Sequence, residues 1–326
     1  MSATALPPLP PMARSVRAYF APVNRAQKQP CIFDPAVNGA FPLDAPPAPW
    51  IDLGWIENFS RKASSRYAEL ATGSPGIAQY QVRETIDATV SFRFKSWSKL
   101  SMALACGSQH MNLIVPAAGG TANGSGCKGV PAVGLAGGST ATFLALAASG
   151  AANFSAGSLV VVDIDYSGQT GFVGSGVSAA YVQSAASVNS DPDYVRRVSF
   201  NVARVASVAG GAAPGLQLAQ PLLAGVPAAG MRVQPITGFV DREGGTFFQE
   251  WSALFVLAGQ QGERILCHYP RLQAVAGASE AAAAMAAPLE RIALSASFRA
   301  LPVTDANDGE QVVCFRSFLP SPNTLV

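Results

Sequence analysis

The sequence has little of what most enzymes and nucleic-acid-binding proteins depend on. Only 13% of its 326 residues are charged, the formal net charge is +2, and the only histidines are His110 and His268. Binding to nucleic acid usually rests on clustered lysine and arginine side chains that neutralise phosphates. No basic run here is longer than a pair such as Arg196 and Arg197. The composition therefore argues against a nucleic-acid-binding function.

Cysteines are few and scattered, and long apolar runs are missing. Without a C-x-x-C pair, the cysteines predict neither a disulfide framework nor a zinc site, and we expect reduced, mostly buried cytosolic thiols. The N-terminus lacks the basic start and apolar run of a secretory signal. Two uncharged stretches are interrupted too often for a membrane span, which needs about 20 apolar residues. We expect no membrane segment. The cysteines are Cys31, Cys106, Cys127, Cys267 and Cys314.

Motifs that carry chemistry are weak. Gly124, Gly126 and Gly129 match G-x-G-x-x-G, but no parallel-sheet strand precedes them, and a flexible loop is the simpler interpretation. Asp163 and Asp165 fall on one side of an expected strand, about 7 Å apart by strand rise, which approaches the spacing of a glycosidase carboxylate pair. A solvated strand face explains them equally well. We expect no enzymatic activity, no cofactor and no metal site.

The residues that are abundant favour β-structure. Thirty-one glycines and 24 prolines supply turns, and Thr85–Gly107 predicts a half-buried strand followed by a short helix. Ser96 is the expected N-cap and Gly107 the expected left-handed C-terminal residue. The apolar side of the strand alternates strictly with its polar side; it consists of Ile86, Ala88, Val90, Phe92 and Phe94.

The order of patterns predicts one β-domain interrupted by another. We expect residues 1–45 to form an extended, proline-rich arm and residues 116–240 to form an inserted or duplicated β-domain. We expect residues 46–115 to form the first part of the other β-domain, and residues 241–326 to form its second part and a C-terminal arm.

Within these regions the local patterns predict individual elements. Residues 50–59 predict a first strand, Ser60–Gln81 a long polar loop with a turn at Gly73–Gly76, and Ser279–Ala287 a short helix. Further strands are expected at Leu159–Tyr166, Phe172–Val177, Tyr194–Val208, Met231–Val240, Phe247–Leu257, Arg264–Leu272 and Ile292–Arg299.

Four segments together resemble a family of virion proteins. WIDLGWIENFSRKASSRYAEL (50–70) followed by RETIDATVSFRFKSWSKLSMALACGSQHMNL (83–113) resembles the major tail tube proteins of long-tailed bacteriophages. FFQEWSALFVLAGQQGERILCHYPRLQ (247–273) and LERIALSASFRALPV (289–303) have the same character. These segments cover under half of the chain, and they match in pattern and order rather than in invariant catalytic residues.

The resemblance implies a tail-tube-like β-sandwich or barrel with a flanking short helix. It also implies six copies closing into a ring, rings stacking into a hollow tube that conducts DNA, and a location in the virion tail after assembly in the host bacterial cytoplasm. The partners would be other copies of the chain, with tape measure and tail terminator proteins. The loop Arg61–Gln81 and the arm Met1–Asp44 would contact neighbouring subunits, and the candidate inter-subunit residues in the loop are Arg61, Lys62, Arg66, Tyr67, Glu69 and Tyr80.

Two other functions fit the same composition. One is another virion component, such as a capsid decoration or tail terminator protein. The other is a secreted carbohydrate-binding or hydrolytic β-protein, for which Asp163 and Asp165 would be the candidate carboxylates.

Overall fold

The computed structural model describes residues 13–23, 29–118, 129–164, 170–173, 178–181, 188–189, 191–260, 262–275, 279–281 and 293–321. Strands dominate it, which confirms the expected mainly β class. The chain divides into two compact units: Met1–Gly107 with Gln249–Val326, and Ser108–Phe248. In the sequence, the second unit lies between the two segments of the first.

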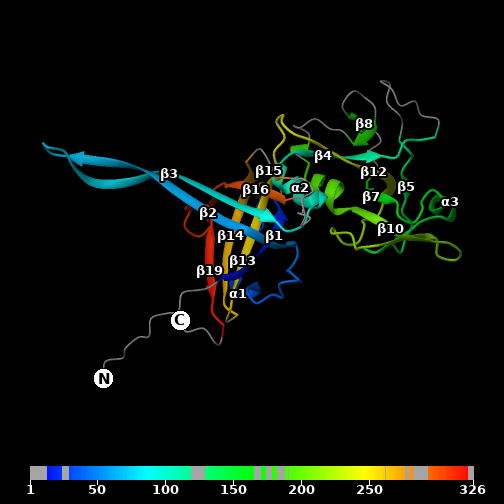
Figure 1. The fold of residues 1–326 in the computed structure, drawn as a ribbon, viewed down its shortest axis with the longest axis horizontal. Coiled ribbons are helices and arrows are strands. Elements are labelled where there is room, and N and C mark those ends of the chain that lie inside the picture. The colour runs from blue at the N-terminus through cyan, green and yellow to red at the C-terminus, as the bar shows by residue number, and fades with distance from the viewer. Residues whose placement is uncertain are drawn as a thin grey trace, which may run out of the picture. The chain divides into compact units, whose positions relative to one another are not determined.

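Six strands of the first unit close into an antiparallel barrel (Figure 1). Pairing runs from β16 through β3, β2, β1 and β13 to β14, and it returns from β14 to β16, where Leu272 lies opposite Ala300. Because the barrel is closed, each of these strands has a partner strand on both of its edges within the barrel. The six strands are β1 (Ala13–Pro22), β2 (Ile51–Thr72), β3 (Ile77–Phe94), β13 (Glu250–Gly259), β14 (Arg264–Ala274) and β16 (Ala293–Ala300).

Two more strands extend this sheet. The short β15 (Ser279–Ala281) pairs with β16, and β19 (Phe315–Leu319) pairs with the first half of β14. The small hairpin of β17 (Val303–Thr304) and β18 (Gln311–Val312) precedes β19. The helix expected over Ser279–Ala287 is wrong at its start, because residues 279–281 pair with β16 as a strand; residues 282–287 lie outside the described residues.

Phenylalanine rings fill the barrel. Phe20 lies 5.4 Å from Phe298 and 6.0 Å from Phe255, centroid to centroid, and Phe92 stacks on Phe298 at 5.7 Å. Each of these rings is almost completely buried. The strict alternation in the sequence therefore marks the interior side of β3 and β16, as expected, from Ala88 onward.

The outer face of β1, β13 and β14 carries a second apolar cluster. Tyr19, Leu254 and Leu266 pack there beneath Phe33 and Trp50, which belong to the segment that leads from β1 to β2. That segment contains the short helix α1 (Pro35–Asn38), whose N-cap side chain, Asp34, accepts hydrogen bonds from the first-turn amides.

The expected N-terminal arm is wrong for most of its length. Residues 13–22 are β1, a strand in the middle of the sheet, and Phe33 and Phe41 cover the barrel as part of the core. Aromatic side chains that bury against a distant sheet stabilise this segment, although its own sequence shows no periodicity. Residues 1–12 and 24–28 lie outside the described residues.

The short helix α2 (Lys99–Cys106) follows β3 and contacts β16. Its N-cap is Ser98 rather than Ser96: Ser98 Oγ accepts from the Ser101 amide at 3.0 Å, and Ser101 Oγ accepts from the Ser98 amide at 2.7 Å, which completes a capping box. Gly107 ends the helix at φ +58°, as expected. A Cβ there would also lie 2.7 Å from the Ala274 Cβ, so both the positive φ and the lack of space favour glycine.

The second unit is a nine-stranded sheet with its own core. The strand order is β6, β11, β10, β7, β12, β4, β9, β8, with β5 beside β12. Leu144, Val160, Val205, Leu216 and Val233 are central to the core. The strands are β4 (Gln109–Ile114), β5 (Val133–Gly134), β6 (Phe143–Ala145), β7 (Leu159–Asp163), β8 (Thr170–Val173), β9 (Ser178–Tyr181), β10 (Val202–Ala209), β11 (Gly215–Leu218) and β12 (Arg232–Arg242); a short helix, α3, spans Ala148–Ala151.

The strand expected over Tyr194–Val208 is half wrong. Arg196–Phe200 form a turn of π-helix before β10 begins. Arg196 pairs with Asp193 at 2.6 Å and Arg197 with Asp191 at 2.6 Å, so ion pairs local in sequence favour the helical turn over an extended chain.

Candidate assembly interface

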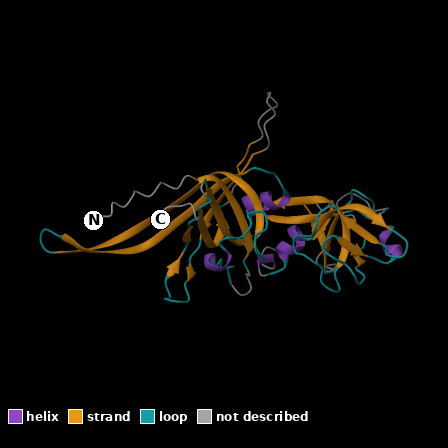
Figure 2. Cartoon of the chain, turned by 90° about the horizontal axis from the view of Figure 1, so that it is seen from below, coloured by secondary structure: helices purple, strands orange, loops and turns teal. Residues whose placement is uncertain are grey.

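The segment expected to reach a neighbouring subunit is a β-hairpin rather than a loop. β2 and β3 remain paired from the barrel to the last pair, Thr72 opposite Ile77, and Gly73–Gly76 form the turn. Figure 2 and Figure 1 both show the hairpin leaving the barrel as a long straight arm. The turn signal was predicted at the right place, but the polar residues on both sides of it are strand residues.

The strand register sorts the hairpin side chains onto two faces. In an antiparallel pair, residues directly opposite each other project to the same side of the sheet. Ala68, Leu70 and Thr72 on β2 therefore share one face with Val82, Tyr80 and Ile77 on β3. Tyr67, Glu69 and Ala71 share the other face with Arg83, Gln81 and Ala78. The residues are assigned by their register.

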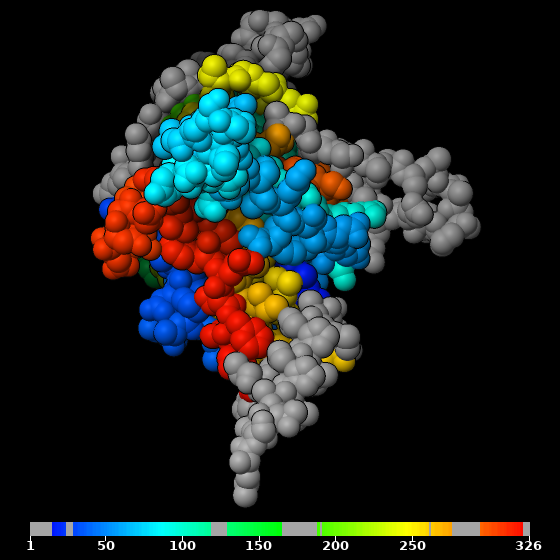
Figure 3. Space-filling model, turned by 90° about the vertical axis from the view of Figure 1, so that its left-hand side faces the viewer, coloured from blue at the N-terminus to red at the C-terminus, as the bar shows by residue number. Residues whose placement is uncertain are grey.

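One face of the projecting hairpin is apolar and exposed. We call it the apolar face and define it by Leu70, Ile77, Tyr80 and Val82, which are 59%, 63%, 70% and 63% exposed. Figure 3 views the molecule from the side toward which the hairpin points, and the hairpin surface in blue and cyan is open to the viewer there. Large apolar side chains that are exposed next to one another are typical of protein–protein contacts.

The opposite face satisfies its own polar groups. Gln81 Nε2 donates to Glu69 Oε1 at 2.9 Å, and the Arg83 guanidinium lies 5.8 Å from the centre of the Tyr67 ring. A hydrogen bond from Arg83 lowers the pKa of the Tyr67 phenol. These contacts join polar side chains across the two strands.

The base of the hairpin is fixed to the barrel by Arg61. Its Nε donates to the hydroxyl of Tyr269 on β14 at 2.9 Å. Burial raises the pKa of Tyr269 to about 12, against the opposing effect of the Arg61 hydrogen bond, and that bond raises the pKa of Arg61. The pair stays in its neutral-phenol, charged-guanidinium form across the physiological range.

The six candidate residues do not form one site. The register places Arg61, Tyr67 and Glu69 on one side of the hairpin, and Lys62, Arg66 and Tyr80 on the other. Only Tyr80 belongs to the apolar face. Sequence reasoning missed the other members of that face. Apolar side chains on both sides of a glycine-containing turn were a signal, but the bulge at Gln79 breaks the two-residue spacing between Ile77 and Tyr80. The missed residues are Leu70, Ile77 and Val82.

The two histidines are buried within different units. His268 is 3% exposed, and burial lowers its pKa to about 4, so the imidazole is neutral. His110 Nε2 lies 3.4 Å from the Asp241 carboxylate, which also accepts a hydrogen bond from the Ser108 hydroxyl. Burial is the main cause that raises the pKa of Asp241.

The expected carboxylate pair is only half described. Asp163 is buried, and its two oxygens accept from Arg196 Nε at 3.3 Å and Nη2 at 3.0 Å, whereas Asp165 lies outside the described residues. Among the described residues, neither unit taken alone holds three metal-ligating side chains close enough together to bind an ion. Among the described cysteines, Cys31, Cys106, Cys267 and Cys314 form no disulfide, and Cys127 lies outside the described residues.

No helix in the described part of the chain is long and apolar enough to span a bilayer. Comparison with known proteins adds no further assignment: a scan against protein-family models and a search of curated proteins both returned no match.

Proposed function

We propose that this chain is a structural subunit that assembles with copies of itself, as the major tail tube protein of a long-tailed bacteriophage. The observation that carries the proposal is the exposed apolar face of the β2–β3 hairpin. The resemblance of residues 50–70 and 83–113 to tail tube proteins falls on this hairpin, the strands that lead into it and the helix that follows.

The physical support is a difference between what folding needs and what the hairpin presents. The barrel closes with its phenylalanine core already buried, so the apolar face contributes nothing to that core. Four large apolar side chains on a rigid arm are unfavourable in water, at roughly 25 cal/mol per Å² of apolar surface. Contact with another copy removes that surface from water.

In the proposed assembly, six copies close into a ring and rings stack into a tube. Tape measure and tail terminator proteins are the further partners, and the tube lies in the virion tail after assembly in the bacterial cytoplasm. A low net charge suits a conduit through which DNA passes without binding. The chain has no proposed enzymatic role.

The alternatives receive less support. A decoration or terminator protein would use the same assembly chemistry, and the shape of the particle separates it from a tube. For a carbohydrate hydrolase, Asp163 is unsuited to acid–base work, because Arg196 already engages both of its oxygens.

Negative-stain electron microscopy of the purified chain tests the proposal. We expect open rings or hollow tubes. The matched variant replaces Ser64–Asp87 with Asn-Gly, which cuts both strands at the opposed pair Ala63 and Ala88 and closes them with a two-residue turn. We expect this variant to fold and to remain monomeric. Strictly monomeric parent protein at all concentrations and salts would overturn the proposal.

A further inference from the structure

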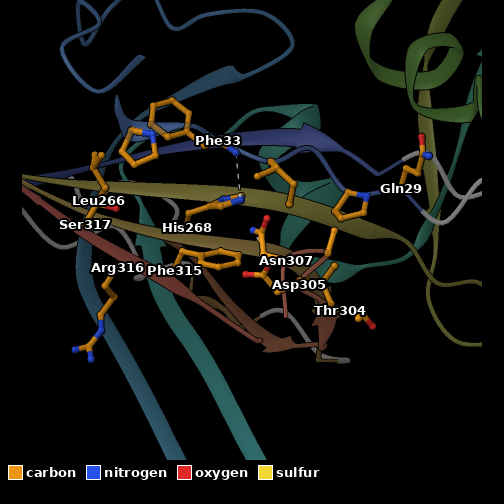
Figure 4. Close-up of a pocket in the computed structure, with 15 residues that line it drawn as sticks. Gln29, Phe33, Leu266, His268, Thr304, Asp305, Asn307, Phe315, Arg316 and Ser317 are labelled. Carbon is orange, nitrogen blue, oxygen red and sulfur yellow. Dashed lines mark hydrogen bonds between the residues drawn. The ribbon is translucent and has the colours of Figure 1, made fainter. Parts of the chain in front are cut away.

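A hollow of about 820 Å³ opens on the outer face of the barrel unit. Its walls come from four separate stretches of chain: the segment that leads into α1, strand β14, strand β17 with the turn that follows it, and strand β19. Figure 4 shows the ring of Phe315 beside His268, with Asp305 and Asn307 on the adjoining side. The apolar part of the lining includes Ile32, Phe33, Leu266 and Phe315.

The histidine in this hollow behaves as an apolar surface. The His268 ring stacks on Phe315, with centroids 6.1 Å apart and planes 17° apart, and its Nε2 accepts from the Phe33 amide at 3.4 Å. With its pKa lowered to about 4 by burial, the ring carries no charge at neutral pH. The stacked pair of His268 and Phe315 therefore gives the hollow an apolar wall that suits an aromatic or aliphatic side chain.

An open strand edge lies beside the hollow. Among the described residues, β19 pairs only with β14, so its second edge has no partner strand. Phe315 lies opposite His268 and Ser317 opposite Leu266, so these residues of β19 share the face on which the hollow opens. An exposed edge next to an apolar hollow is the arrangement that binds an added β-strand.

The hairpin offers the complementary parts. Beyond its base, the described strand pairings of β3 involve only β2, so Ile77–Ala88 present a second open edge. Three of the four side chains of the apolar face, Ile77, Tyr80 and Val82, belong to this strand. The hairpin points away from its own barrel (Figure 1), so it does not reach its own hollow, and a hairpin that fills the hollow belongs to a second copy.

We propose that the β3 edge of the hairpin pairs with β19 of a second copy and inserts Tyr80 into that copy's hollow. The inference rests on the proposed function and names the receiving surface. A tyrosine brings a large ring and a hydroxyl that needs a hydrogen-bonding partner, and the side chains of Asp305 and Asn307 line the hollow. Donor and acceptor surfaces differ, so the contact is head-to-tail and generates a ring or a filament rather than a closed dimer.

Disulfide trapping between two differently substituted copies tests this geometry. One copy carries Tyr80→Cys, and the other carries Ala306→Cys in the hollow. We expect a cross-linked heterodimer under mild oxidation. The matched control is Tyr67→Cys mixed with Ala306→Cys, because Tyr67 is on the same hairpin but on its opposite face. The unsubstituted chain gives the background from the native thiols.

Equal cross-linking by the Tyr80→Cys and Tyr67→Cys copies, or none by either, would overturn the proposal. Assembly measured by sedimentation gives an independent readout. Tyr80→Ala should raise the concentration for half-assembly by about 30-fold, the effect of losing an interface hot spot, and Tyr67→Ala by less than about threefold.

Blocking the hollow separates this proposal from the proposed function. We expect Ala306→Arg to prevent assembly as Tyr80→Ala does, while unfolding of the isolated subunit is unchanged. If Ala306→Arg assembles normally but Tyr80→Ala does not, the hairpin contact stands and the hollow is not its acceptor. If the parent chain never assembles, both proposals fail.

Discussion

Strands β2 and β3 differ between the part that belongs to the barrel and the part that projects from it as the hairpin. Near the barrel, β3 buries Val90 and Phe92 among the phenylalanines of the interior. Beyond Ala88, β3 still alternates, but the bulge at Glu84 turns Tyr80 and Val82 to the face opposite that of Val90. Tyr80 and Val82 are exposed because the other barrel strands do not continue beside them. The comparison teaches that an alternating pattern marks a face that requires a partner, and that the partner can be another part of the chain or another copy.

The largest expected effect is in the barrel half. Phe298→Ala removes a fully buried ring that contacts Phe20 and Phe92. We expect the free energy of unfolding to fall by about 3–5 kcal/mol, because a cavity remains in a packed core. Denaturant unfolding of the isolated subunit measures this. If Phe298→Ala lowers the free energy of unfolding no more than a substitution at an exposed hairpin residue does, the distinction between the barrel part and the projecting part is contradicted.

The next effect concerns the outer face of the barrel and depends on pH. His268 is buried with a pKa lowered to about 4, whereas in the unfolded chain it takes up a proton near pH 6.5. The unfolded state therefore binds the proton first. The contribution of His268 to stability is constant above about pH 7 and falls between about pH 6.5 and 4, by on the order of 3 kcal/mol in total.

Unfolding of the parent and of His268→Gln, measured across that range, checks the sign. We expect the variant to lose this part of the pH dependence, since glutamine does not titrate. The same slope in both proteins would show that other groups cause it.

A smaller effect is expected at the base of the hairpin, where β2 and β3 leave the barrel. Arg61→Met keeps most of the side-chain length but removes the hydrogen bond to the Tyr269 hydroxyl. We expect a loss of about 1 kcal/mol in unfolding free energy, typical of one hydrogen bond. Tyr269→Phe is the partner variant. If the two changes together cost as much as the sum of each alone, the contact contributes nothing.

The smallest effect on folding is expected in the projecting half. Tyr80→Ser should change the unfolding free energy of the isolated subunit by no more than about 0.5 kcal/mol, because its side chain is 70% exposed. Thermal unfolding under monomeric conditions measures this. A loss of 2 kcal/mol or more would mean that the apolar face already has a partner within the subunit.

The parts of the fold that could be predicted are those with a local signal. Alternation identified the buried side of β3 and of β16, where Leu294 and Phe298 face the interior, and Gly107 identified the end of α2. The predictions failed where distant contacts decide the structure. Phe33 and Phe41 pack over β1 and over β13 and β14, whose residues are more than 200 positions away, and their own neighbours carry no periodic pattern.

The candidate site was located more accurately than it was described. Its span and its turn were predicted, but polar residues on both sides of Gly73–Gly76 suggested a loop. A strand that projects beyond the core has no buried side, so its sequence need not alternate between apolar and polar residues. The candidate inter-subunit residues were selected for charge or an aromatic ring, and this criterion favoured Lys62 and Arg66 over Leu70 and Val82. The strand register, which depends on bulges at Glu84 and Gln79, could not be read from the sequence.

A cryo-electron microscopy reconstruction of the assembled particle, resolved well enough to trace strands, tests the central claim most directly. We predict stacked rings in which the apolar face formed by Leu70, Ile77, Tyr80 and Val82 is buried against another copy. Particles in which that face remains exposed to solvent, or preparations with no assembled particle at all, would contradict it.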